Sequence, residues 1–199
     1  MQIDWEPPEP RSGAIGQWDR FVGPGATNAE EWIQLILGGC IAAACIAVFW
    51  VDAPVWATWY HYVLVVLLGL DIGGGIVTNA TNSAKRWYHR SGHGAGKHLL
   101  FVSTHVLHLA AIALFFASDA ISYFAASAIM FAVSAMVIVS SPLYLQRPIA
   151  YGLFALILVA SMMPVFEIEG LAWFLPLMAL KLLLGHLTKE APFRPEIEL

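Results

Sequence analysis

Charge is scarce in this sequence. Only 12% of its 199 residues are Asp, Glu, Lys or Arg, whereas 59% are hydrophobic; soluble domains typically carry about 25% charged residues. A single core in a chain of this length cannot bury so much apolar surface. The composition therefore excludes an ordinary soluble domain and predicts an integral membrane protein. The net charge of −4 gives no basis for nucleic-acid binding.

Several signatures of known chemistry are also missing. Cysteine occurs twice, at Cys40 and Cys45 within one apolar run, which indicates neither a disulfide framework nor a metal knuckle. The sequence has no HExxH or GxSxG motif, and "GHGAGKH" is not a P-loop because His98 stands where Ser or Thr is required. The first 30 residues are acidic, rich in Pro and Gly, and lack the apolar core of a signal peptide. These motifs therefore assign no function.

What the sequence does have is six apolar runs: Trp32–Trp50, Trp56–Thr78, Leu99–Ala117, Ile121–Val139, Ile149–Val165 and Leu171–Leu187. Each is close to the length that an α-helix needs to cross about 30 Å of hydrocarbon, and the last two are the shortest. The runs predict an all-α bundle of six transmembrane helices over residues 30–187. A cytoplasmic or interfacial tail at 1–29 precedes it, and a cytoplasmic tail at 188–199 follows it.

Basic residues predict the orientation of the bundle. The loop between the second and third runs carries Lys85, Arg86, Arg90 and Lys97. Apart from Lys181 inside the sixth run, the remaining basic residues follow the fourth run or lie in the two tails. The alternate short loops hold no Lys or Arg. Because cytoplasmic loops are enriched in Lys and Arg, both termini are predicted to be cytoplasmic in a multi-pass protein of the cytoplasmic (inner or plasma) membrane.

The stretch "VLLGLDIGGGIVTNATNS" places Asp71 inside the second run, next to three glycines. With the predicted topology, Asp71, His105, His108 and Lys181 all lie about 9–15 Å below the inner surface, at 1.5 Å per residue. A charged residue at mid-membrane costs roughly 2.5–3.5 kcal/mol, which pairing of Asp71 with Lys181 or with a protonated His105 would offset. The glycines allow close approach of a helix or a ligand. Together they predict a polar cavity open to the cytoplasmic leaflet.

Three histidines, His98, His105 and His108, fall on one stripe of the third run. A His pair three residues apart can share a metal, and neutral imidazoles can equally join helices by hydrogen bonds. The histidines therefore leave a divalent metal at His98, His105 and His108, a haem, or no cofactor as alternatives. A histidine beside a carboxylate is also suited to acid–base catalysis near neutral pH.

The leading hypothesis is a membrane-embedded enzyme or cofactor protein that acts on a membrane-soluble substrate or one with an anionic headgroup. Asp71 and His105 would handle protons or bind a metal, with His98 and His108 as further ligands or proton carriers. The predicted substrate-binding residues are Asn79 and Asn82, which would orient the substrate, Arg86 and Arg90, which would hold an anionic headgroup, and Lys181.

Two other classes of function fit the same residues. One is a small proton-coupled transporter, acting as a homodimer, in which Asp71 and Lys181 line the path. The other is a subunit of a larger membrane complex. The partners predicted in every case are the lipid bilayer and anionic lipid headgroups. The sequence alone does not decide between these classes.

Overall fold

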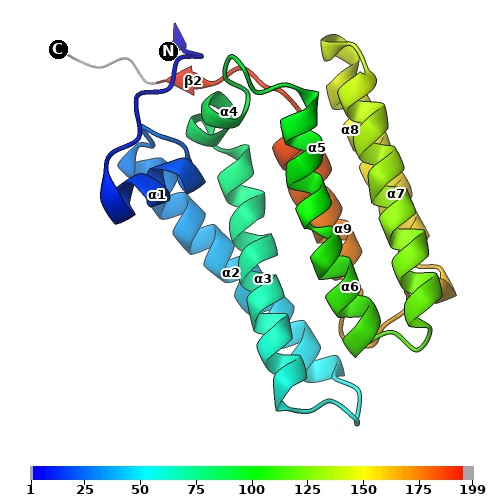
Figure 1. The fold of residues 1–199 in the computed structure, drawn as a ribbon. Helices are drawn as coiled ribbons and strands as arrows, with labels where there is room; N and C mark the ends of the chain where they lie inside the picture. Colours follow the sequence, from blue (N-terminus) through cyan, green and yellow to red (C-terminus); the bar gives the residue numbers. More distant parts are fainter. Residues whose placement is uncertain (1, 195–199) are drawn as a thin grey trace.

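The computed structural model describes residues 2–194 and is nearly all helical (Figure 1). Within these residues, five segments are long and apolar enough to cross a membrane. They are α2 (Asn28–Asp52), α3 (Trp59–Ala80), the consecutive helices α5 (Ala95–Thr104) and α6 (Val106–Phe115), α7 (Ala120–Ser140) and α8 (Leu143–Ala160). The chain is therefore a multi-pass membrane protein by its composition and helix lengths.

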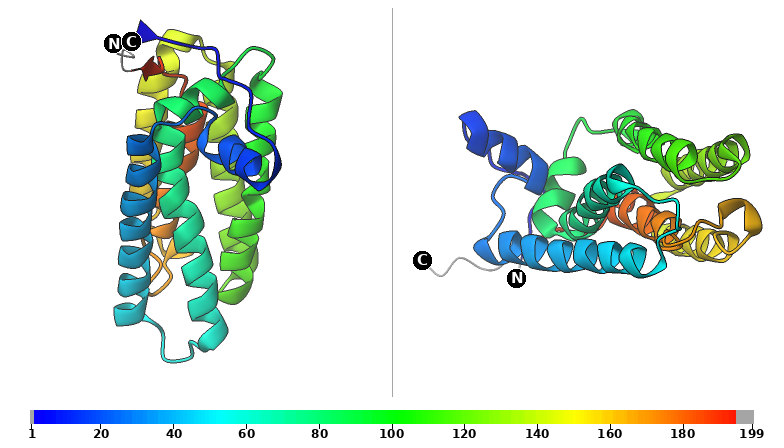
Figure 2. Two further views of the ribbon diagram at one scale, coloured as in Figure 1. Left: turned by 90° about the vertical axis from the view of Figure 1, so that its left-hand side faces the viewer. Right: turned by 90° about the horizontal axis from the view of Figure 1, so that it is seen from below.

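The sixth predicted run forms a shorter apolar helix over Phe174–Leu187, after a 3-10 turn, η1 (Pro164–Phe166). Its first part is α9 (Phe174–Ala179), and its second part is a π-helix, η2 (Leu180–Leu187). This helix lies in the middle of the bundle, where Figure 2 shows it in orange among the other helices. Phe174, Leu182 and Leu183 are completely buried there. The shortest of the six apolar helices is thus the most enclosed one.

Two runs differ in detail from the sequence prediction. The fifth run was expected to begin at Ile149, but α8 begins at Leu143 and contains Pro148. Pro148 is the sixth residue of α8 and has no N–H group, so the Tyr144 carbonyl lacks its usual partner four residues later. The third run is interrupted at His105, whose ψ of −4° ends α5 and lets α6 begin at Val106. This break sets the direction of the His105 side chain.

Glycines bring α2 and α3 into close contact. A Cβ atom on Gly38 would lie 2.9 Å from the Gly74 Cα, and one on Gly73 would lie 2.8 Å from the Gly38 carbonyl oxygen. Neither distance is compatible with a larger residue, so the two backbones approach each other as small-residue packing in membranes allows. α2 begins with a capping box in which Thr27 and Glu30 exchange hydrogen bonds.

The tails form a cover at one end of the bundle. Helix α1 (Gly13–Val22) packs against α4 (Asn82–Tyr88), and β1 (Gln2–Ile3) pairs antiparallel with β2 (Phe193–Arg194). Both ends of the described chain therefore lie at the same end of the molecule (Figure 1). Figure 2 shows α1 projecting sideways from that end.

Candidate functional site

A cluster of three ionisable side chains lies between α3, α6 and η2. The Lys181 Nζ atom donates to the Asp71 Oδ2 atom at 2.5 Å, and His108 Nε2 lies 3.1 Å from the same oxygen. The Lys181 side chain is only 4% exposed, whereas that of Asp71 is 42% exposed. The carboxylate thus compensates a buried ammonium. The histidine that contacts it is His108, not His105 as the sequence suggested.

Gly75 makes room for Lys181. A Cβ atom at position 75 would lie 2.3 Å from the Lys181 Cε atom, well inside van der Waals contact. A Cβ atom at Gly74 would meet nothing within 4 Å. The ion pair therefore requires a glycine at position 75, whereas position 74 has room for a larger residue.

His105 borders the cluster at the break between α5 and α6. Its Nδ1 atom lies 3.0 Å from the Phe101 carbonyl oxygen, which can only accept a hydrogen bond. Nδ1 therefore carries the hydrogen, and the Nε2 atom of the neutral ring keeps its lone pair. The ring stacks on that of His108, with 5.0 Å between centroids. The Nε2 atom of His105 can therefore accept a proton.

These side chains line a pocket of about 240 Å³. Asp71, Gly75, Thr78, Asn79, His105, His108 and Lys181 contribute to it, together with Phe21, Tyr88, Phe101 and Thr104. Asn79 is buried, and its Nδ2 atom donates to the Lys181 carbonyl oxygen at 3.4 Å. The polar layer predicted from helix depth is therefore a real juxtaposition of side chains.

The residues predicted on the basic loop do not join this pocket. Asn82 accepts a hydrogen bond from the Phe193 backbone N–H at 3.2 Å, and Arg90 lies over the Trp87 ring. Arg86 is buried, pairing with Asp4 at 2.8 Å and donating to the Pro24 carbonyl at 2.9 Å. The chain turns away after α3, so these groups contact the tails or their own loop.

A second group of histidines lies nearer the covered end. His98 Nδ1 is 3.2 Å from His186 Nε2, and His89 Nε2 is 3.0 Å from the His186 carbonyl oxygen. All three side chains are buried. Burial lowers the pKa of His89, which lies outside the spans, to about 3, so this ring is neutral. Phe101 stands between the two groups, stacked on His186 and tilted against His105.

Lys85 closes the end of η2 beneath this group. Its Nζ atom donates to the carbonyl oxygens of Gly185 and Thr188, both at 2.6 Å. Burial lowers the pKa of Lys85 to about 8. A cation at the carboxyl end of a helix also complements its dipole. Lys85 thereby fixes the helix that carries Lys181 and His186.

The histidines predicted as metal ligands are divided between the two groups. His98 lies with His89 and His186, whereas His105 and His108 lie beside Asp71. Within residues 2–194, no set of three or more His, Cys, Asp or Glu side chains is placed to hold a metal ion. The geometry therefore gives the predicted metal site no support.

From the sequence, His186 is only one of several candidates for a third metal ligand, and His89 has no role in the predicted site. At 100° per residue, His186 lies about 140° around the helix from Lys181. In a π-helix, hydrogen bonds run from residue i to i+5, so residues five apart come to the same face. The sequence did contain one indication of this group, because two polar residues, Lys181 and His186, lie in the same short apolar run.

The opposite end of the α3–α6 interface is closed. The His61 Nε2 atom lies 3.1 Å from the Phe115 carbonyl oxygen. The rings of Tyr60 and Phe116 pack against His61, with centroids 4.2 and 5.1 Å away. The polar pocket is therefore separated from that end of the molecule by a layer of aromatic side chains.

No protein-family model, curated protein or solved structure matches this chain. The chemistry of the site is therefore the guide to the function of this chain.

Proposed function

We propose that the chain crosses the cytoplasmic membrane six times, with both termini in the cytoplasm. The pairing of β1 with β2 supports an even number of crossings because it joins the two ends of the described chain. The short helix Phe174–Leu187 is then the sixth span. The basic residues near the paired ends favour the cytoplasmic side for that end. A green fluorescent protein fused after Leu199 should fluoresce; a dark, exported fusion would refute this orientation.

We propose further that the protein is a membrane-embedded enzyme that transfers a proton to or from a membrane-soluble substrate. The observation that carries this proposal is His105, whose free Nε2 lone pair borders a pocket shared with Asp71, His108 and Lys181. Intramembrane ionisable residues are costly and are typically retained for function. General acid–base catalysis requires such a group within reach of the reacting atom.

The other residues have distinct roles in this proposal. His105 accepts or returns the proton at Nε2. Asp71 holds His108 and Lys181 in place, and Lys181 supplies positive charge for a developing anion on the substrate. Asn79 and Thr78 offer hydrogen bonds for orienting the substrate. Arg90 remains the candidate contact for an anionic headgroup, because it is half-buried at the loop surface.

A proton-coupled transporter is the second candidate. The Asp71–Lys181 pair beside a run of glycines fits a substrate path, and a homodimer would be its expected form. A transporter must open alternately to both sides. Beyond the pocket, the α3–α6 interface is packed with aromatic side chains around His61 and offers few polar groups to a moving substrate or proton, which favours the enzyme.

The enzyme proposal is tested by lipid conversion. Purified protein is reconstituted into liposomes made from a total membrane lipid extract, and the lipids are compared by mass spectrometry before and after incubation. Wild-type protein should deplete one species and accumulate another, and His105→Gln should not. His93→Gln, outside this pocket, is the matched control and should behave as wild type.

Two outcomes would contradict the enzyme. Identical lipid profiles for wild type and His105→Gln would mean that His105 catalyses no conversion of a membrane lipid. Proton flux into liposomes that contain a pH-sensitive dye, present in wild type and lost in Asp71→Asn, would favour the transporter instead.

A further inference from the structure

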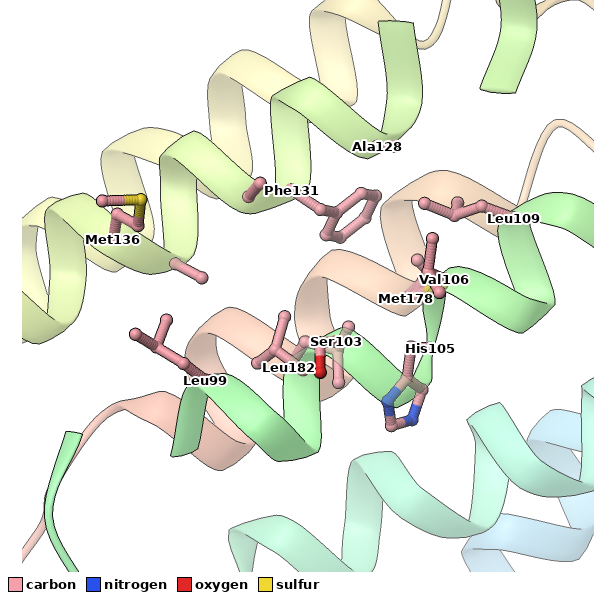
Figure 3. A pocket seen from close by; sticks show the side chains of 13 residues that line it. Leu99, Ser103, His105, Val106, Leu109, Ala128, Phe131, Met136, Met178 and Leu182 are labelled. Carbon is pink, nitrogen blue, oxygen red and sulfur yellow. The ribbon is translucent and has the colours of Figure 1, made fainter. Parts of the chain in front are cut away.

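An apolar groove lies on the far side of His105 from the polar pocket. It has a volume of about 440 Å³ and runs between α5–α6 and α7, with α9 and η2 as its floor. Figure 3 shows Phe131 and Met136 of α7 facing Leu99 and Leu109 across it. Ser103 and His105 supply its polar atoms. A volume of several hundred Å³ with few polar groups is typical of a ligand site.

His105 belongs to both cavities. It lines the groove and the polar pocket, and Figure 3 shows its ring directed from the edge of the groove toward α3. The floor of the groove is formed by Met178 and Leu182, and Leu182 is adjacent to Lys181 of the ion pair. An apolar compartment and a proton-accepting group thus share one wall and one supporting helix.

The dimensions of the groove decide what it can hold. Its α5–α6 wall extends from Leu99 to Leu109, which is about 15 Å at 1.5 Å per residue. The volume of about 440 Å³ spread over that length gives a channel about 6 Å wide. A transmembrane helix is about 10–12 Å wide, so the helix of a second copy does not fit. A single hydrocarbon chain does.

We propose that the groove binds the hydrocarbon chain of the substrate, whose polar end meets Ser103 and His105. The substrate class is then a membrane amphiphile with one long chain. This inference rests on the proposed function for the identity of the substrate, but binding of the chain can be measured without any catalysis. The chain enters sideways from the bilayer, past Val106 and Met136 on the rim, which are 38% and 61% exposed.

The test is photo-crosslinking with palmitic acid that carries a mid-chain diazirine, added to purified protein in nanodiscs. Labelled peptides are located by mass spectrometry. We expect labelling of α6 and α7 at the groove to saturate with probe and to be displaced by unlabelled palmitic acid. Ala132→Phe, which fills the groove, should reduce it about tenfold, equivalent to about 1.4 kcal/mol. Ala125→Phe, an exposed position on α7 outside the groove, should leave it unchanged.

Val106→Phe fills the groove from the opposite wall and should cause the same loss, which protects the test against a misfolded Ala132→Phe. Labelling that rises linearly with probe, or that is equal in the filled and control variants, would mean bulk lipid contact only and would overturn the inference. His105→Gln should weaken the labelling but leave it saturable, because the apolar side chains of the groove still hold the hydrocarbon chain. Loss of lipid conversion with labelling retained separates failure of the catalyst from failure of the chain site.

Discussion

Substituting Asp71 and substituting Lys181 should lower the free energy of unfolding by different amounts, although the two residues form one ion pair. Lys181 is buried, whereas Asp71 is partly exposed and also contacts His108. Asp71→Asn therefore leaves a buried ammonium without its carboxylate. Lys181→Met leaves a carboxylate that still has a histidine and solvent access. A linear, flexible methionine also suits the apolar site of the lysine stem.

The magnitudes follow from burial. Removing one member of a buried pair costs about 3–5 kcal/mol. For Asp71→Asn we expect about 2–3 kcal/mol, because the amide oxygen still accepts one hydrogen bond. For Lys181→Met we expect about 1 kcal/mol, the upper limit for pairs with an exposed member. The double variant should cost no more than Lys181→Met, which gives a coupling free energy of about 2–3 kcal/mol.

The assay is equilibrium unfolding of the purified protein in mixed micelles with increasing SDS, followed by the fluorescence of its eight tryptophans. Asp119→Asn is the matched control. Asp119 is the exposed N-cap of α7, accepting from the Ser122 N–H, and Asn caps helices as well as Asp does. It should change the free energy of unfolding by less than about 0.5 kcal/mol. If the two single variants lose equal free energies of unfolding and the double variant loses their sum, Asp71 and Lys181 do not form a stabilising pair.

Two further predictions concern neighbouring positions. Gly75→Ala should displace the Lys181 ammonium and reduce lipid conversion at least about tenfold, equivalent to about 1.4 kcal/mol. Gly74→Ala should retain lipid conversion and gain up to about 1 kcal/mol of stability from helix propensity. Equal lipid conversion in the two variants would contradict the close packing of Gly75 against Lys181. The folded-state pKa of His89, about 3, is below its unfolded value of about 6.5, so the unfolded chain binds the extra proton and stability falls as pH drops through this window. Between pH 7 and 5, protonation linked to His89 should lower the free energy of unfolding by about 2 kcal/mol. If the free energy of unfolding of a His89→Gln variant changes with pH as steeply as that of wild type, His89 is not the group responsible.

The sequence was most informative about how deep the ionisable side chains lie in the membrane. Counting residues from the predicted inner ends of the spans placed Asp71, His108 and Lys181 in one layer, and the structure brings those three side chains into contact. This works because a transmembrane helix has a fixed rise per residue and the apolar runs have clear ends. Asn79 also lines the pocket, although it lies about 80° around an ideal helix from Asp71. Asn82, which shares the face of Asp71 by the same count, instead contacts Phe193.

The sequence was least informative where the backbone leaves regular α-helix. Arg86 was expected to face lipid headgroups, but the turn at Thr81 directs it into contacts with the tail. The approach of His186 to His98 depends on a π-helix, and the direction of His105 depends on a helix break. Neither feature has a local signature as distinct as proline, because both are stabilised by packing with distant segments.

The strand pair β1–β2 makes the order of synthesis important. Residues 2 and 3 are synthesised about 190 residues before their partners at 193 and 194. Lys85 likewise waits for the carbonyl oxygen of Thr188. The membrane helices can therefore insert one after another while the cover formed by the tails stays open. A chain cut before Thr188 would have its spans in the bilayer but would lack the partners of β1 and one partner of Lys85, so synthesis of residues 188–194 is what closes the molecule.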